Sequence, residues 1–275
     1  IYSNIMVKFK VTCTEDNQIF VVTSAFSKLY NKFKDLKFQR GRIVHITGSP
    51  GTGKSSNIYH AINLLDLKFY DAELKLNSLK LSPKEVFEEF INTLKRDFNL
   101  KTKEEAYTEL SKYDIVLFAD KLLDYGYLNK NRIQLSEWLR VNRLKSIILY
   151  FIVIYECLKY YNDLKRVNLV FHTTWTFLLN NKKYDLLTDF RFSSKLFTGI
   201  LNLFFEVVEI RYYEVETIEI VKSHFEGISD SQIRKYIQKY GCRPRYILEA
   251  INDNLITSKA SNSNIKAVKP VCKPR

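Results

Sequence analysis

A glycine-rich loop is the feature of this sequence with the clearest chemistry. Residues 48–55 read Gly-Ser-Pro-Gly-Thr-Gly-Lys-Ser, a spacing in which glycines let successive backbone N–H groups turn inward around a phosphate. Lys54 would contact the β- and γ-phosphates of a nucleotide, and Ser55 would offer its hydroxyl oxygen to Mg²⁺. We therefore expect a site for ATP with Mg²⁺. Its expected contact residues are Gly48, Ser49, Pro50, Gly51, Thr52, Gly53, Lys54, Ser55 and Ser56.

The segments on either side of the loop are those that a phosphate-binding loop requires. An apolar run at 43–46 precedes it and predicts a strand, whereas Ile58, Ala61, Ile62 and Leu65 follow with helical spacing. The N-terminus of that helix would add its dipole to the anion site. A chance glycine-rich turn would lack this strand–loop–helix context, so the pattern favours phosphate binding.

A second residue for the metal is predicted at the end of a later apolar run. Residues 114–120 read Asp-Ile-Val-Leu-Phe-Ala-Asp, so a carboxylate follows four apolar residues and one small residue. Phosphate-binding loops of this kind work with an aspartate on a neighbouring strand, which holds the Mg²⁺. We predict that role for Asp120; the alternative is an aspartate that caps the next turn.

The residue after Asp120 bears on hydrolysis. Lys121 stands where many such ATPases carry a glutamate that polarises the attacking water. Either Glu137 or Asp124 takes that part, or the chain turns over slowly and acts as a nucleotide-dependent switch.

From residue 42 onward, short apolar runs alternate with longer segments of helical spacing. This alternation predicts an α/β fold, a three-layer sandwich in which crossover helices cover a five-stranded parallel sheet. Ser82 and Pro83 supply an N-cap and a first helical residue. The expected strands are 42–47, 67–74, 114–119, 167–173 and 205–211. The expected helices are 53–65, 82–98, 102–112, 135–162, 176–202 in pieces, 215–226, 230–240 and 244–253.

The same patterns divide the chain into four parts. Residues 1–37 should hold two strands, at 5–13 and 18–23, and a basic amphipathic helix at 25–36. We expect a nucleotide-binding core at 38–212, a small helical lid at 213–254, and a basic, disordered tail at 255–275. The apolar run at 147–158 is too short to span a bilayer and predicts a buried helix.

Composition limits the classes of partner and compartment. The formal net charge of +13 favours a nucleic-acid partner, although adaptation to high temperature gives similar compositions. The four cysteines are scattered, which predicts neither a zinc site nor a disulfide framework and fits a reducing cytoplasm. The first residues lack a signal-peptide pattern, and the missing initial Met suggests an incomplete chain.

Over residues 38–254 these motifs resemble the AAA+ class of P-loop ATPases, in particular its archaeal ATPase, STAND and replication-initiator-like branches. The resemblance rests on the phosphate loop, the polar end of the strand at 167–174 and the segment Gly241-Cys242-Arg243-Pro244-Arg245. It implies the strand order 5-1-4-3-2. It also implies a sensor 1 at Thr173 or Thr174, touching the γ-phosphate or the water, and a sensor 2 at Arg245, reaching the phosphates.

The resemblance also suggests an intersubunit arginine finger. Arg191 precedes the fifth expected strand about where the family carries that residue, with Lys195 and Arg211 as rivals. An arginine finger would imply a nucleotide-dependent homo-oligomer. The alternative to Thr173 and Thr174 as a sensor is a pair of β-branched residues chosen for packing, and the alternative to Arg245 is a solvated loop arginine.

The function expected from these features is that of an ATP-hydrolysing motor or switch. ATP would close the lid through Arg245, and the change would act on DNA or on a protein partner, with no membrane involved. The alternatives are a small-molecule or nucleotide kinase that uses the same loop, and a RecA- or KaiC-like ATPase. The helix at 28–37 would either lie on a phosphate backbone or simply pack its apolar face.

Overall fold

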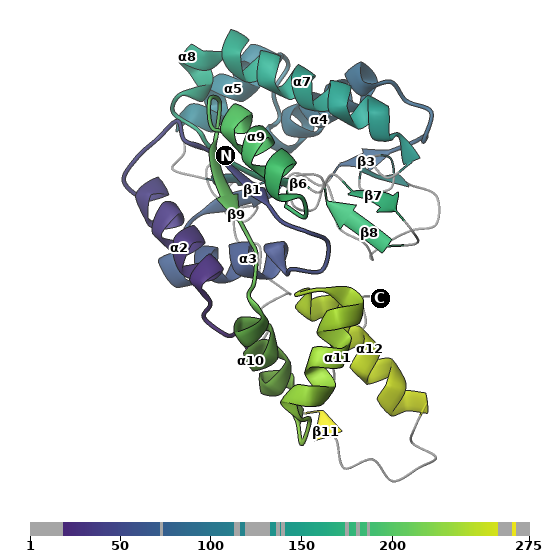
Figure 1. Ribbon diagram of the computed structural model, residues 1–275. Coiled ribbons are helices and arrows are strands. Elements are labelled where there is room, and N and C mark those ends of the chain that lie inside the picture. Colours follow the sequence, from purple (N-terminus) through teal and green to yellow (C-terminus); the bar gives the residue numbers. More distant parts are fainter. Residues whose placement is uncertain are drawn as a thin grey trace.

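The computed structural model describes residues 19–71, 74–112, 116–118, 133–135, 138, 141–173, 176–179, 182–185, 188–257 and 266–267. Its centre is a sheet of five strands, each parallel to its neighbours (Figure 1). Read from one edge, the strands are β2 (Phe69–Asp71), β4 (Val116–Phe118), β6 (Asn168–Thr173), β1 (Ile43–Thr47) and β9 (Glu206–Glu209). Numbered along the chain and read from β9, the order is 5-1-4-3-2.

Helices cover both faces of the sheet, so the predicted mixed α/β class is confirmed (Figure 1). One face carries α2 (Ser24–Leu36) and α3 (Lys54–Leu65), which pack on each other and on β1 and β9. The other face carries α4 (Pro83–Phe98), α5 (Lys103–Lys112), α7 (Arg143–Lys159), α8 (Tyr161–Leu164) and α9 (Arg191–Leu201). Ser82 caps α4 through a capping box with Glu85, as its sequence predicts.

The basic helix α2 uses its apolar side for packing. Leu29 and Phe33 are fully buried against α3. Two of its lysines are engaged within the molecule: Lys32 forms an ion pair with Glu206 at 3.2 Å, and Lys37 donates to the Leu65 carbonyl at 3.2 Å. These contacts favour a packing role for α2 over the alternative of a helix laid on a phosphate backbone.

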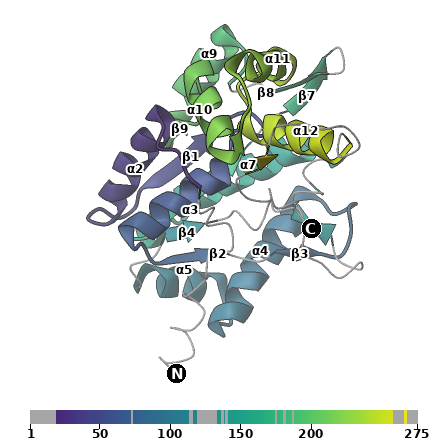
Figure 2. The ribbon, with the colours of Figure 1, turned by 90° about the horizontal axis from the view of Figure 1, so that it is seen from below.

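Beyond β9 the chain forms three helices with a core of their own. These are α10 (Glu214–His224), α11 (Asp230–Tyr240) and α12 (Pro244–Thr257), and Figure 2 shows the group from below. Val221, Phe225, Ile233 and Ile247 fill the space between them. Gly241 ends α11 and Pro244 begins α12, as expected of a glycine after a helix and a proline at the start of the next.

The sequence predicts helix in pieces over 176–202, and this prediction is wrong for the first half of the segment. Thr176–Leu179 (β7) pairs antiparallel with Lys182–Asp185 (β8), and only α9 is helical. The two short runs flank Asn180-Asn181, a turn-forming sequence, and their antiparallel pairing decides in favour of a hairpin. A further pair, Lys75–Leu76 (β3) with Ile133–Gln134 (β5), was not anticipated.

Two expectations at the ends of the chain also need correction. Residues 19–23 form no strand; instead the Thr23 hydroxyl accepts from the Phe26 N–H at 3.1 Å and caps α2. Within the tail expected to be disordered, Lys266–Ala267 (β11) pairs with Phe225–Glu226 (β10). The strand expected at 5–13 lies outside the described residues.

The apolar run at 147–158 lies in α7 and is not buried as predicted. One side of α7 packs on the core, but Ile148, Phe151, Tyr155 and Leu158 are each more than half exposed. Within the part of the chain that the structure describes, no helix is long and apolar enough to cross a membrane.

A buried histidine lies in β1, between β6 and β9. His45 stacks on Phe171 with ring centroids 4.5 Å apart, and its Nδ1 lies 3.2 Å from the Tyr150 hydroxyl of α7. Burial and the neighbouring His172 lower the pKa of His45 from 6.5 to about 3. His45 is therefore neutral in the folded chain at pH 7.

We expect this histidine to make the chain less stable in acid. Because the folded pKa lies below the unfolded one, the unfolded chain binds the proton first, and stability falls as the pH drops from about 6.5 toward 3. Between pH 7 and pH 5 His45 should lower the free energy of unfolding by about 2 kcal/mol. Urea titrations of wild type and His45→Asn at both pH values measure this; an equal loss in the two proteins would contradict it.

Candidate functional site

The glycine-rich loop joins β1 to α3, as its sequence predicts. Two of its glycines have left-handed backbone conformations: Gly51 with φ +86° and Gly53 with φ +68°. A side chain at either position would be strained, because L-residues rarely adopt positive φ. Gly53 is also the N-cap of α3, so the loop wraps the positive end of the helix dipole. The loop thus has the backbone form of an anion cradle.

The ammonium group of Lys54 is directed back into this loop. Its Nζ donates to the carbonyl oxygens of Gly48 at 2.7 Å and Ser49 at 3.3 Å, and the residue is 8% exposed. The Thr52 hydroxyl also donates to the Ser49 carbonyl, at 2.9 Å. The cation therefore lies in the concave side of the loop, where it could exchange carbonyl oxygens for phosphate oxygens.

The lid helix α12 begins directly on the loop. The backbone N–H of Arg245 donates to the Gly51 carbonyl at 3.1 Å. A Cβ added to Gly51 would lie 3.2 Å from the ring of Tyr246, so the ring rests on the glycine. The side chain of Arg245, predicted to reach the phosphates, is exposed. The contact between lid and loop is thus made by the backbone of Arg245 and the ring of Tyr246.

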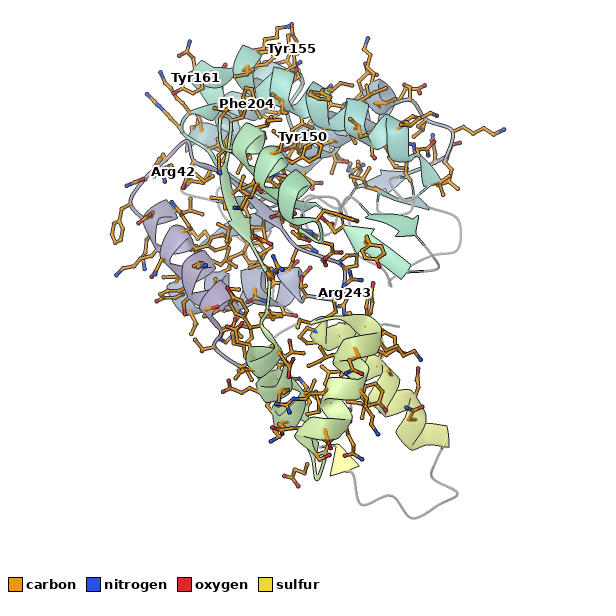
Figure 3. The ribbon with its side chains drawn as sticks, viewed as in Figure 1. Arg42, Tyr150, Tyr155, Tyr161, Phe204 and Arg243 are labelled. Atoms are coloured by element: carbon orange, nitrogen blue, oxygen red, sulfur yellow. The ribbon has the colours of Figure 1, made fainter. Side chains whose placement is uncertain are left out.

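Asp189 connects the loop to the lid through its side chain. Its Oδ1 accepts from the Ser49 hydroxyl at 2.5 Å, and its Oδ2 accepts from the Arg243 guanidinium at 2.7 Å. The Asp185 N–H donates to the same Oδ2 at 2.7 Å, and the Thr188 hydroxyl lies 2.9 Å from that of Ser49. Figure 3 shows Arg243 where the lid meets the core. One carboxylate thus holds three segments together.

A second link joins the first turn of α3 to the chain entering the lid. The Asn57 amide donates to the Gly53 carbonyl at 2.8 Å and to the Tyr212 hydroxyl at 2.7 Å. Asn57 and Tyr212 are both buried, and burial raises the pKa of Tyr212 to about 12. Tyr212 lies at the boundary expected between core and lid, so this contact joins the chain just before α10 to α3.

The remaining predicted site residues are only partly described. Thr173 ends β6 and is paired in register with Thr47, the last residue of β1, so its backbone lies beside the start of the loop. Arg191 is the first residue of α9. Five other candidates lie outside the described residues: Asp120, Lys121, Asp124, Glu137 and Thr174.

No group of three or more histidine, cysteine, aspartate or glutamate side chains is arranged to hold a metal among the residues that are described. For the predicted Mg²⁺ pair, Ser55 lies in the first turn of α3 next to Lys54. Its hydroxyl is the kind of oxygen ligand that Mg²⁺ accepts beside nucleotide phosphates.

Arg243, Tyr246 and Asp189 are side chains of the site that were not singled out from the sequence. Arg243 and Tyr246 flank the predicted Arg245, so the motif carried a signal for them. Asp189 carried no local signal, because it is 140 residues from Ser49 along the chain. Only the folded arrangement brings it to the loop.

Comparison with known proteins adds little about this site. No family model and no curated protein matches the sequence. Three similar solved structures are Drosophila ORC bound to DNA, Cdc6p from Pyrobaculum aerophilum and a DNA replication initiation factor. Their sequence identities are 14%, 14% and 15%, and their TM-scores are 0.44, 0.46 and 0.41.

The three alignments cover 94%, 91% and 90% of this chain but only 62%, 66% and 65% of the matched chains. The chain therefore spans less than two thirds of the length of each. With TM-scores below 0.5, these likenesses are too weak to assign an activity, a cofactor or a partner.

Proposed function

We propose that this chain is an ATP-binding switch of the AAA+ type, which hydrolyses ATP slowly and transmits lid movement to a nucleic-acid or protein partner. The observation that carries the proposal is the strand–loop–helix unit at 43–65. It combines left-handed Gly51 and Gly53, the start of α3, and a lysine ammonium inside the loop. Together these features favour a polyphosphate over other ligands.

The residues of the loop divide the work of holding the nucleotide. Backbone N–H groups from Gly51 to Ser55 would bind the β-phosphate, and Lys54 would leave its two carbonyl partners for phosphate oxygens. Ser55 and Asp120 would hold Mg²⁺, which when bound neutralises charge on the phosphates. The Ser49 hydroxyl, already bonded to Asp189, contributes to the loop's shape more than to a phosphate contact.

In this proposal the lid carries a conformational change from the nucleotide site to the partner. Because α12 starts on Gly51, a movement of the loop when phosphate binds would displace the Arg245 N–H and the Tyr246 ring, which both contact Gly51. We take residues 38–212 as the nucleotide-binding core and 213–254 as the lid, with Tyr212 as the hinge. Thr173 or Thr174 as sensor 1, Arg245 as sensor 2 and Arg191 as arginine finger remain parts of this proposal.

A nucleic-acid partner is supported by charge. The chain carries 43 lysine and arginine residues against 30 acids, and such an excess attracts phosphate backbones in a salt-dependent way. We therefore infer DNA as the partner to test first. DNA that stimulates ATP turnover, with a stimulation that weakens as salt increases, would support this choice.

Asp120 provides the test of hydrolysis. We expect Asp120→Ala to bind ATP in the absence of Mg²⁺ about as well as wild type, and to lose turnover by about 100-fold because an electrostatic stabiliser of the reaction is removed. Phosphate release with and without DNA measures turnover. Glu219→Ala, on an exposed side of α10, is the matched control. Full turnover in Asp120→Ala would remove Asp120 from the site.

A further inference from the structure

An exposed apolar surface lies on the side of the core opposite α2 and α3. It is formed by α7 and α9 together with residues 203 and 204, and we call it the α7–α9 face. Phe151 is 62% exposed, Tyr155 63% and Leu203 78%. Its members are Leu144, Ile147, Ile148, Phe151, Tyr155, Leu158, Leu196, Ile200, Leu203 and Phe204.

The two helices form one continuous surface because they share a buried seam. Tyr150 and Ile154 of α7 and Phe197 of α9 all pack against the buried Leu201 and Phe205. The exposed residues of α7 recur at helical spacing on its solvent side, whereas Tyr150 turns inward. Figure 3 shows Tyr155 on the outer side of α7, Tyr150 between α7 and α9, and Phe204 near the end of α9.

The size of the α7–α9 face exceeds what a monomer ordinarily exposes. Its ten members are 38% to 79% exposed. At about 150–250 Å² for a large side chain they expose on the order of 1,000 Å², whereas the largest apolar patch on a typical monomer is about 300–600 Å². About 800 Å² per partner is enough for a standard stable interface. The face is thus large enough to support a specific association by itself.

Charge narrows the kind of partner. Residues 146–155 and 196–205 contain no charged residue. Nearby Lys145 donates to the Lys80 carbonyl at 3.2 Å, and Glu156 is buried with Tyr107 and Lys103. With no charge to be complemented, the face fits a surface as apolar as itself. An identical surface on a second copy meets that condition.

We propose that the α7–α9 face is the interface of a two-fold symmetric homodimer, in which α7 of one copy packs on α7 and α9 of the other. Two-fold symmetry is the commonest arrangement in which a surface patch packs against the same patch of a second copy. The phosphate loop and the lid contact each other through Gly51, Ser49 and Asp189 and contribute nothing to this face. The dimer therefore forms with or without nucleotide.

Sedimentation of the full chain tests the proposal. At about 50 µM we expect wild type to sediment as a dimer and Phe151→Glu as a monomer, because the variant buries a charge at the centre of the interface. Each copy carries a net charge of +13, so higher salt should screen the mutual repulsion and strengthen the dimer several-fold. Lys54→Ala should remain dimeric.

The matched control is Leu64→Glu, which places the same charge on α3, a helix on the opposite face of the sheet where Leu64 is 57% exposed. It should leave the dimer intact. A wild-type chain that stays monomeric at 50 µM overturns the proposal, and so does co-sedimentation of that monomer with lipid vesicles. A dimer that Phe151→Glu does not weaken, while the melting temperature is unchanged, overturns it as well.

Discussion

Replacing Lys54 with alanine should abolish useful nucleotide binding, weakening the affinity for ATP by about 100-fold or more. The ammonium of this lysine lies inside the glycine loop: its Nζ donates to the Gly48 and Ser49 carbonyls. Charge-assisted hydrogen bonds contribute about 1.5–3 kcal/mol each, so the loss of two to phosphate oxygens gives the expected factor. Calorimetric titration with ATP measures it.

Two controls separate the loss of a ligand from damage to the fold. Lys68→Ala removes an exposed lysine just beyond α3 and should bind ATP like wild type. Lys54→Arg keeps the charge but not the compact ammonium, and should bind poorly because a planar guanidinium fork does not reproduce the contacts of a compact ammonium. If Lys54→Ala binds ATP normally, or if wild type does not bind at all, the proposed function is wrong.

The parts of this site that the sequence predicts are those encoded locally. Residues 43–55 specify strand, loop and helix start within thirteen positions, because the apolar run predicts the strand and glycine, proline and lysine each impose a backbone or charge requirement. Gly241 and Pro244 likewise mark the end of one lid helix and the start of the next. These residues indicate local structure whatever the rest of the fold is.

The parts that could not be predicted depend on tertiary contacts. Asp189 reaches Ser49 only in the folded chain, where it also accepts from the Asp185 N–H at the end of the β7–β8 hairpin. The sequence pattern predicts helix for that hairpin. Its short runs, Thr176–Leu179 and Lys182–Asp185, satisfy helical and strand periods about equally well, and pairing decides between them. The exposure of α7 has the same origin, because hydrophobicity alone does not say whether a side faces a core or a partner.

Breaking the Asp189–Arg243 pair is the second change from which we expect a large effect. Both side chains are largely buried, at 21% and 14% exposed, and the carboxylate also accepts from Ser49 in the phosphate loop. Arg243→Gln would leave a negative charge at the edge of a site meant for anions. The affinity for ATP should fall about tenfold, because the unpaired Asp189 carboxylate would repel the phosphates and solvent screens that repulsion only partly at short distance.

Adding Asp189→Asn to Arg243→Gln shows whether Arg243 acts by neutralising Asp189 or by contacting the nucleotide directly. In Asp189→Asn/Arg243→Gln both charges are gone, so the affinity for ATP should return to within about threefold of wild type, while Asp189→Asn alone should bind ATP at least as well as wild type. In unfolding experiments the two single variants should show a coupling of about 1–3 kcal/mol. Arg245→Gln serves as a comparison, because that side chain is exposed, lies two residues further along the chain and is the proposed sensor 2.

A double variant that binds ATP no better than Arg243→Gln would contradict this reasoning. In that case Arg243 itself would have to contact the nucleotide, and the resemblance to a sensor arginine would pass from Arg245 to Arg243. The ion pair seen here would then be the resting position of a residue that leaves Asp189 when ATP binds. Because Asp189 also bonds Ser49, that departure would loosen the loop and the lid together, and ADP and ATP would differ in how firmly they hold α12 in place.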